Sequence, residues 1–201
     1  ALKIINHLPE SVIKNELISL IINYKAKNNM LNYEDHLTLT ASYLHVPNPL
    51  LQKDELTQAD KLFLTAIQNN LNENKRKQAP LILTSLKNDR LKAKGVSLIL
   101  KDDNKNNRPF KAYQLIKSNA KFLKFFLKNN TAPNLTSRIY SVSHSLHKLN
   151  HPVKAFKIAQ VIQAFPQKQT LMKLILPELR KTGHLKEAII AQKYATQLKR
   201  N

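Results

Sequence analysis

Lysines recur at helical spacing in one segment near the middle of the chain. Lys117, Lys121, Lys124 and Lys128 are four, three and four residues apart, so on one continuous helix they would form a single basic stripe. A row of ammonium groups can contact successive phosphates of a nucleic-acid backbone. The pattern therefore predicts a phosphate-binding helix, although the solvated side of an ordinary amphipathic helix has the same spacing. The residues expected on the opposite, docking side are Phe122, Leu123, Phe125 and Phe126.

Two shorter basic clusters and one mixed pair extend the candidate interface. The clusters, which are either phosphate contacts or loop charge, are Lys75, Arg76 and Lys77, and Arg90, Lys92 and Lys94. Arg138 and Tyr140 lie near the start of a predicted helix, where charge and stacking would together contact RNA. Tyr140 is equally suited to packing between helices.

No arrangement typical of a catalytic or metal site occurs in the sequence. His144, His147 and His151 are three and four residues apart, but a predicted helix end precedes His151, so we expect no convergence on a metal ion. There is no Cys, no glycine-rich phosphate loop and no serine-hydrolase motif. Neighbouring acids such as Asp54 and Glu55 point in different directions on a helix. We predict no enzymatic activity, no cofactor, no metal and no small-molecule substrate.

The positive charge is concentrated in one part of the chain. The 201 residues carry a net charge of +20, but residues 1–73 have 6 Lys/Arg against 8 Asp/Glu, whereas residues 74–201 have 27 against 5. Clustered cations repel one another in a compact fold and are stabilised by a polyanion, since each phosphate contact releases counterions. We therefore expect an anionic partner for residues 74–201, with a merely solubilising basic surface as the alternative.

Composition favours helices joined by short turns. Only two Gly occur and there is no Asn-Gly or Asp-Gly pair, so tight β-hairpins are not expected. The periodic stretches are rich in Leu, Ile, Lys, Ala and Gln, most of which are good helix formers. No apolar run reaches the roughly 18 residues that span a bilayer, so no integral membrane segment is predicted. The chain begins at Ala1 rather than Met, so its sequence does not reveal a signal or transit peptide.

Three segments resemble one another and predict a helix–turn–helix repeat. They are residues 107–113 (NRPFKAY), 150–156 (NHPVKAF) and 183–189 (GHLKEAI). Asn or Gly at the first position can end a helix in the left-handed conformation, and Pro two residues later suits the first turn of the next helix. A small residue recurs five positions after each helix end and would let two helices approach closely. These residues are Ala112, Ala155 and Ala188, spaced 43 and 33 residues apart.

Apolar residues on either side of the last two breaks follow helical periodicity. Those preceding a break are Ile139, Val142, Leu146 and Leu149, and Leu171, Leu174, Ile175 and Leu179. Those following a break are Ala155, Ile158, Ala159 and Ile162, and Ala188, Ile189, Ala191 and Ala195. Further helices are predicted over 11–27, with Val12, Leu17, Leu20 and Ile21 inward, and over 33–44, 53–71 and 80–100. Polar loops are expected at 72–77 and 101–107, and residues 98–100 are compatible with helix or strand.

Residues 137–166, and those from Thr170 onward, resemble pentatricopeptide repeats. The likeness lies in an apolar first helix, a break at Asn150 or Gly183, and the Ala that follows each break. Tetratricopeptide repeats share the Gly and Ala spacing, but Leu176 stands where the small residue of their first helix belongs. The resemblance implies a right-handed α-solenoid that binds RNA, in the mitochondrial matrix.

The position that reads a base in such repeats falls on Tyr140 and Lys173 rather than on Asn, Ser or Thr. This departure indicates contact with structured RNA, or a place inside a ribonucleoprotein, rather than decoding of one base per repeat.

The sequence thus predicts an all-α solenoid, with a near-neutral, less regular part (1–73) and a basic repeat part (74–201), either as one continuous solenoid or as a fragment of a longer chain. The expected function is that of an RNA-binding scaffold for rRNA or mRNA. Such a protein would be a ribosomal or ribosome-associated component, or an RNA maturation or translation factor, with other ribonucleoprotein subunits as further partners. The alternative is a tetratricopeptide-like adaptor that binds proteins and makes no RNA contact.

Overall fold

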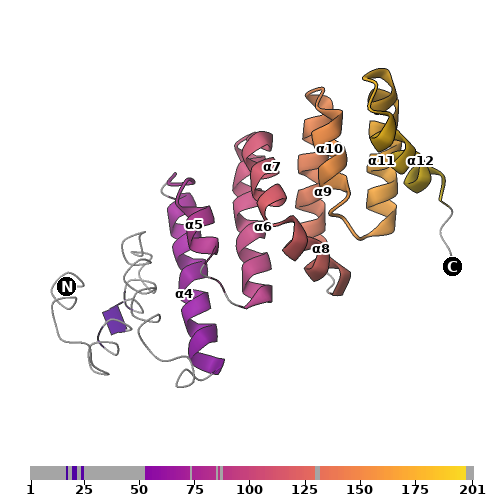
Figure 1. Cartoon of the computed structure of the whole chain (residues 1–201). Helices are drawn as coiled ribbons and strands as arrows, with labels where there is room; N and C mark the ends of the chain where they lie inside the picture. The colour runs from indigo at the N-terminus through magenta and orange to yellow at the C-terminus, as the bar shows by residue number, and fades with distance from the viewer. Residues whose placement is uncertain are drawn as a thin grey trace. The chain divides into compact units, whose positions relative to one another are not determined.

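A computed structural model describes residues 53–72, 74–84, 86, 88–129 and 132–197, with single positions at Leu17, Leu20, Ile21 and Tyr24. Within these residues the secondary structure is helical, with no strand, which confirms the all-α prediction. The helices are α4 (Lys53–Asn72), α5 (Ala79–Leu83), α6 (Asp89–Lys105), α7 (Pro109–Ser118), α8 (Ala120–Asn129), α9 (Pro133–Lys148), α10 (Pro152–Ala159), α11 (Phe165–Lys181) and α12 (Leu185–Thr196) (Figure 1).

The chain forms two compact units, residues 1–99 and residues 100–201. In the first unit α4 contacts α5. In the second, each of α9, α10 and α11 contacts the helix that follows it, and α7 contacts α8, α9 and α10 (Figure 1). Contacts also join α9 to α11 and α10 to α12, so helices of one hairpin pack on those of the next.

The hairpin turns share one backbone geometry. A residue with positive φ ends the first helix in each, at Asn74 (59°), Asn107 (49°), Asn150 (59°) and Gly183 (75°). Its N–H bonds to the carbonyl three residues earlier, and the next N–H bonds to the carbonyl five residues earlier; at Asn150 these distances are 3.0 and 2.9 Å. Both bonds satisfy carbonyls that the helix end leaves without partners, as in the Schellman motif.

The turn at Asn74 is a further repeat turn, although the sequence predicts only a polar loop at 72–77. Its N–H lies 3.1 Å from the Leu71 carbonyl oxygen, and the Lys75 N–H lies 2.7 Å from that of Asn70. Ala79 follows Asn74 by five residues and is buried, as are Ala112, Ala155 and Ala188 after the other turns. The other three turns have Pro or Leu two residues after the left-handed residue, whereas Arg76 occupies that position after Asn74 and hid this member.

The inserted helix α8 accounts for the uneven spacing of the repeats. Successive left-handed residues are 33, 43 and 33 positions apart, and the long interval contains the 10-residue helix α8 between α7 and α9. Without α8 the three intervals would be equal. We therefore regard α8 as an insertion between two otherwise regular hairpins.

The core is made of the apolar stripes that the sequence predicted, with local exceptions. Ile139, Val142 and Leu146 of α9, and Leu171, Ile175 and Leu179 of α11, are buried. Three residues predicted to be internal in the last two repeats are exposed instead, at the C-cap of α9, on α11 and on α12. They are Leu149, Leu174 and Ile189.

Polar side chains fix the start of α6 in the first unit. Asn88 caps α6, because its Oδ1 accepts hydrogen bonds from the N–H groups of Arg90 and Leu91 at 3.0 and 3.1 Å. The buried carboxylate of Asp60 on α4 in turn accepts the Asn88 N–H. This link ties the start of α6 to the middle of α4.

Several sequence-based boundaries need correction. Residues 101–105 continue α6 rather than forming a loop, because Asp103 is fully buried and Asn104 donates to the Arg138 carbonyl at 3.4 Å. Residues 98–100 are helical. Leu17 and Leu20, predicted to be inward, are exposed. Apart from its four described positions, the helix predicted over 11–27 lies outside the described residues, as does the one over 33–44.

Candidate nucleic-acid interface

The inserted helix α8 presents a lysine-rich face to solvent. Lys121, Lys124 and Lys128 are exposed, whereas Leu123 and Phe126 are buried against the rest of the second unit. In the described parts of residues 100–201 no carboxylate forms an ion pair with these three lysines. Their positive charge is therefore left for an external anion.

Lys117 does not belong to this face, and the single stripe predicted over 117–128 is wrong. The chain leaves helical geometry at Asn119, so Lys117 lies at the end of α7 and the other three lysines lie on α8. At the break the Leu115 carbonyl oxygen accepts from Ser118 Oγ at 3.0 Å and from Asn119 Nδ2 at 2.9 Å, in addition to the Asn119 N–H at 3.2 Å. These bonds cap the end of α7.

Phe125 is also placed differently from the prediction. It was expected to dock α8 with Phe122 and Phe126, but its side chain is 66% exposed. Phe122 and Phe126 lie against each other, with ring centroids 5.7 Å apart. On a helix with 3.6 residues per turn, Phe125 falls beside Lys121 and Lys128 on the solvent side. The exposed face of α8 thus consists of these three lysines, the Phe125 ring and Asn129 at the end of the helix.

A buried cation lies close to this face, and sequence reasoning did not find it. Lys168 of α11 is largely buried, and its Nζ lies 4.5 Å from the centroid of the Tyr194 ring on α12. Burial lowers the pKa of the Lys168 ammonium, and repulsion from Lys124 lowers this pKa further. The ammonium groups of Lys168 and Lys124 therefore lie close enough to repel each other, and both belong to one positively charged region of the second unit.

The remaining basic clusters lie in the first unit. Lys75, Arg76 and Lys77 form the turn between α4 and α5, with Lys75 and Lys77 exposed. Arg90, Lys92 and Lys94 lie in the first two turns of α6, with Arg90 and Lys94 exposed.

Arg138, Tyr140 and Lys173 lie in the second unit on α9 and α11. Arg138 is half-buried, and burial lowers the pKa of its guanidinium. The half-buried Tyr140 ring stacks on His144, with centroids 6.2 Å apart and an interplanar angle of 17°. Lys173 is exposed. Tyr140 thus has a packing partner within its own helix, which leaves its predicted RNA contact open.

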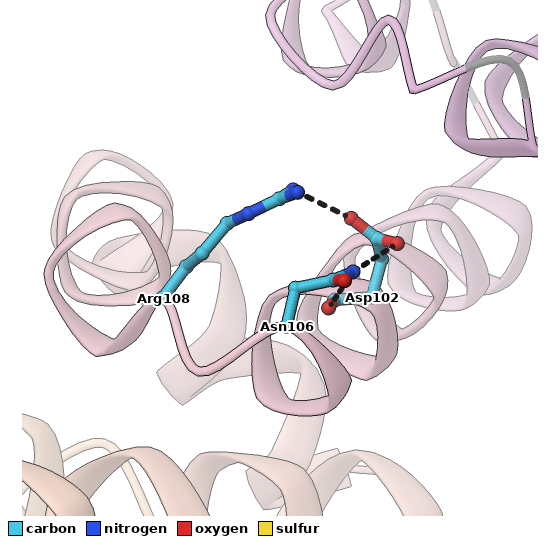
Figure 2. A network of polar contacts seen from close by, with 3 residues as sticks. All are labelled: Asp102, Asn106 and Arg108. Atoms are coloured by element: carbon cyan, nitrogen blue, oxygen red, sulfur yellow. Dashed lines mark hydrogen bonds and ion pairs between the residues drawn. The ribbon is translucent and has the colours of Figure 1, made fainter.

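Basic residues mark every hairpin end, a pattern visible in the sequence once the turns are aligned. The residue after the left-handed position is Lys75, Arg108, His151 or His184. The positive charges of Lys75 and Arg108 near the last carbonyls of a helix are favoured by its dipole. At the α6–α7 turn this charge is neutralised: Arg108 Nη1 lies 3.1 Å from Asp102 Oδ2, and Asn106 Nδ2 donates to Asp102 Oδ1 at 2.9 Å (Figure 2).

The α7 and α10 hairpin ends meet through an aromatic contact. The Phe110 ring lies 4.9 Å from the His151 ring in an edge-on arrangement, and Lys154 Nζ lies 4.8 Å from the centroid of the same Phe110 ring. Phe110 and Lys154 belong to successive hairpins, so this contact joins one hairpin to the next. Lys154 therefore packs on an aromatic ring rather than on a carboxylate.

No metal centre is found among the described residues, where no three His, Asp or Glu side chains converge. Of the three histidines considered, His144 has a lowered pKa, chiefly because of burial and secondly because of the nearby Lys148 and His147. None of the helices in the described part of the chain is long and apolar enough to cross a bilayer.

No family model, no curated protein and no solved structure matches the chain.

Proposed function

We propose that the protein is an RNA-binding scaffold of helical repeats, and that its contacts are centred on α8. The observation that carries the proposal is the face formed by Lys121, Lys124 and Lys128, whose charges have no carboxylate partner in the described parts of residues 100–201. Polyanions such as RNA are attracted to rows of unpaired cations, because binding releases counterions from the phosphates. The net charge of +20 supports the same class of partner.

The architecture we propose is a right-handed α-solenoid of the pentatricopeptide kind. It is supported by four turns of one geometry and by the contacts between successive hairpins in the second unit. The likeness of residues 137–166 to pentatricopeptide repeats further supports a role in a mitochondrial ribonucleoprotein. Within such a particle the protein would be a ribosomal or ribosome-associated component, or an RNA maturation or translation factor.

A salt titration tests the proposal. The logarithm of RNA affinity is expected to fall linearly with the logarithm of salt concentration, and the triple variant Lys121→Gln, Lys124→Gln, Lys128→Gln should lower that slope by about 2, at roughly 0.7 per phosphate contact on a single strand. A matched control removes three exposed lysines from α11 and α12, through Lys181→Gln, Lys186→Gln and Lys193→Gln.

The control variant should change the slope by less than about 1. Equal effects of the two triple variants would remove α8 as the centre of binding. A slope near zero for the unaltered protein would remove RNA binding itself.

A protein-binding adaptor is the second candidate, and α12 supplies the observation that favours it. Leu185 and Ile189 are 67% and 71% exposed, whereas Pro152 and Phe156, the corresponding residues after the preceding turn, are buried. An exposed apolar pair at positions that are otherwise internal is typical of a docking surface. Partners that remain bound after nuclease treatment in a pull-down would favour this candidate, and partners released by nuclease would favour RNA.

A further inference from the structure

Phe125 is the most exposed aromatic residue in the described parts of residues 100–201. It projects from the inserted helix α8, where it contributes nothing to the buried side formed by Leu123, Phe126 and Leu127. An exposed apolar ring loses the stabilisation that burial would give it, so its position among lysines calls for an explanation.

The neighbours of Phe125 define the chemistry that it can take part in. Lys121 precedes it by four residues and Lys128 follows it by three, so one ammonium group lies about one helical turn to either side of the ring. Lys124 is adjacent in sequence and is repelled by Lys168 of α11. Along α8 the order is therefore ammonium group, aromatic ring, ammonium group. A ligand with a flat π-face between two negative charges would be complementary to it.

An unpaired nucleotide segment has this order of groups, because each base is flanked by phosphates along the strand. Stacking on an aromatic side chain is open to any unpaired base, while flanking cations hold the backbone. In a duplex, by contrast, the faces of the bases are covered by their neighbours, and the deep major groove of A-form RNA is closed to side chains. A protruding ring on a helix therefore adds nothing to duplex binding.

We propose that α8 binds an unpaired segment of RNA, with Phe125 stacked on one base and with Lys121 and Lys128 at the phosphates on either side. This inference rests on the proposed RNA-binding function and adds to it the class of RNA and the residue that selects it. Stacking is insensitive to salt, whereas the lysine contacts are not, so the two contributions separate in one experiment.

The test measures binding of the full chain to a fluorescent polyuridine of about 12 nucleotides, within the range of single-strand site sizes, and to an RNA duplex of similar length. Phe125→Ala should weaken polyuridine binding roughly 5- to 100-fold at every salt concentration and leave the salt slope unchanged. Phe125→Trp should restore the affinity, because the larger ring also stacks. Duplex affinity should change less than about twofold.

A matched control is Ile189→Ala, which removes an equally exposed apolar side chain from α12. It should leave both affinities unchanged. If Phe125→Ala leaves polyuridine binding intact while the salt slope of the unaltered protein is steep, the stacking inference is wrong and the proposed function stands. Equal losses on duplex and single strand would also overturn the inference. If the unaltered protein binds neither RNA, the proposed function fails together with it.

A lipid surface is the competing ligand, because lysines around a protruding ring also suit an anionic bilayer. Flotation with vesicles of phosphatidylcholine and phosphatidylserine separates the two. Loss of flotation in Phe125→Ala with unaltered polyuridine binding would assign the ring to lipid and overturn the inference. The expected result is no flotation of the unaltered protein at physiological salt.

Discussion

Ser143 of α9 donates a hydrogen bond from its Oγ to the backbone carbonyl oxygen of Ala155 of α10, over 2.8 Å and with both residues fully buried. The contact is possible because Ala155 has no side chain beyond Cβ, which lets the two helices approach closely. The hydrogen bond of Ser143 and the small side chain of Ala155 therefore stabilise the same point of the hairpin, and a substitution can alter each of them separately.

Removing the hydroxyl or enlarging the alanine should destabilise the second unit. We expect Ser143→Ala to cost about 1 kcal/mol, the usual worth of one intramolecular hydrogen bond, and Ala155→Leu to cost about 1–3 kcal/mol through overpacking. Urea denaturation measures both values. Ser141→Ala is the control, because Ser141 is exposed on the same helix and bonds only to the Ser137 carbonyl at 3.1 Å. A loss for Ser141→Ala as large as that for Ser143→Ala would contradict the role of the interhelical bond.

The turn glycine Gly183 should resist replacement for backbone reasons alone. Its φ is +75°, and nothing lies within 4 Å of where a Cβ would stand, so no side-chain clash contributes. Gly183→Ala is expected to cost about 1–2 kcal/mol, the penalty of the left-handed conformation for an L-residue. Gly183→Asn should cost less, because Asn occupies the same position in the other three turns. A thermal or urea midpoint for Gly183→Ala equal to that of the unaltered protein would show that the turn can relax.

The repeat turns illustrate what the sequence could and could not predict. Asn150 and Gly183 were recognisable because a small residue follows each by five positions and an apolar stripe precedes each. Asn74 has the same buried alanine, Ala79, but Arg76 stands two residues after it, where the other turns have Pro or Leu. Such local patterns can be predicted from sequence, because each Schellman turn satisfies the same helix carbonyls and so favours Asn or Gly at the same position.

The error in the basic stripe has a different physical origin. Periodicity alone cannot register a helix break, and the lysine spacing continued across Ser118 and Asn119, whose side chains bond to the Leu115 carbonyl. The exposure of Phe125 and the burial of Lys168 depend on which faces of α8 and α11 meet other helices. These are tertiary properties that residue type does not predict, because Phe is usually buried and Lys is usually exposed.

His144 makes the stability of the second unit sensitive to pH. Its pKa is lowered in the folded state, first by burial and then by Lys148 and His147, so the unfolded chain binds the proton more readily. Stability is therefore greatest above the ordinary histidine pKa of about 6.5 and falls as the pH drops through that value towards the lower folded-state pKa. The urea midpoint should be lower at acidic pH than at neutral pH, and His144→Gln should reduce this difference. An unchanged pH dependence in His144→Gln would assign the effect to another group.

Deleting α8 separates the repeat scaffold from its proposed interface. Removal of residues 120–129 would bring the interval between Asn107 and Asn150 from 43 to 33 residues, which is the spacing of the other two intervals. Residue 119 and residues 130–132 would then join α7 to α9, a connection of four residues compared with the five, 160–164, that join α10 to α11. We expect the shortened chain to remain helical and to unfold cooperatively, with some loss of stability because Leu123 and Phe126 no longer cover their neighbours.

Its RNA affinity should fall, and the salt slope should decrease by about 2, as for the loss of three single-strand phosphate contacts. Circular dichroism during thermal unfolding and the salt titration together check both expectations. A chain that no longer folds would show that α8 is an integral part of the stack, and an unchanged slope in a folded chain would place the RNA contacts elsewhere.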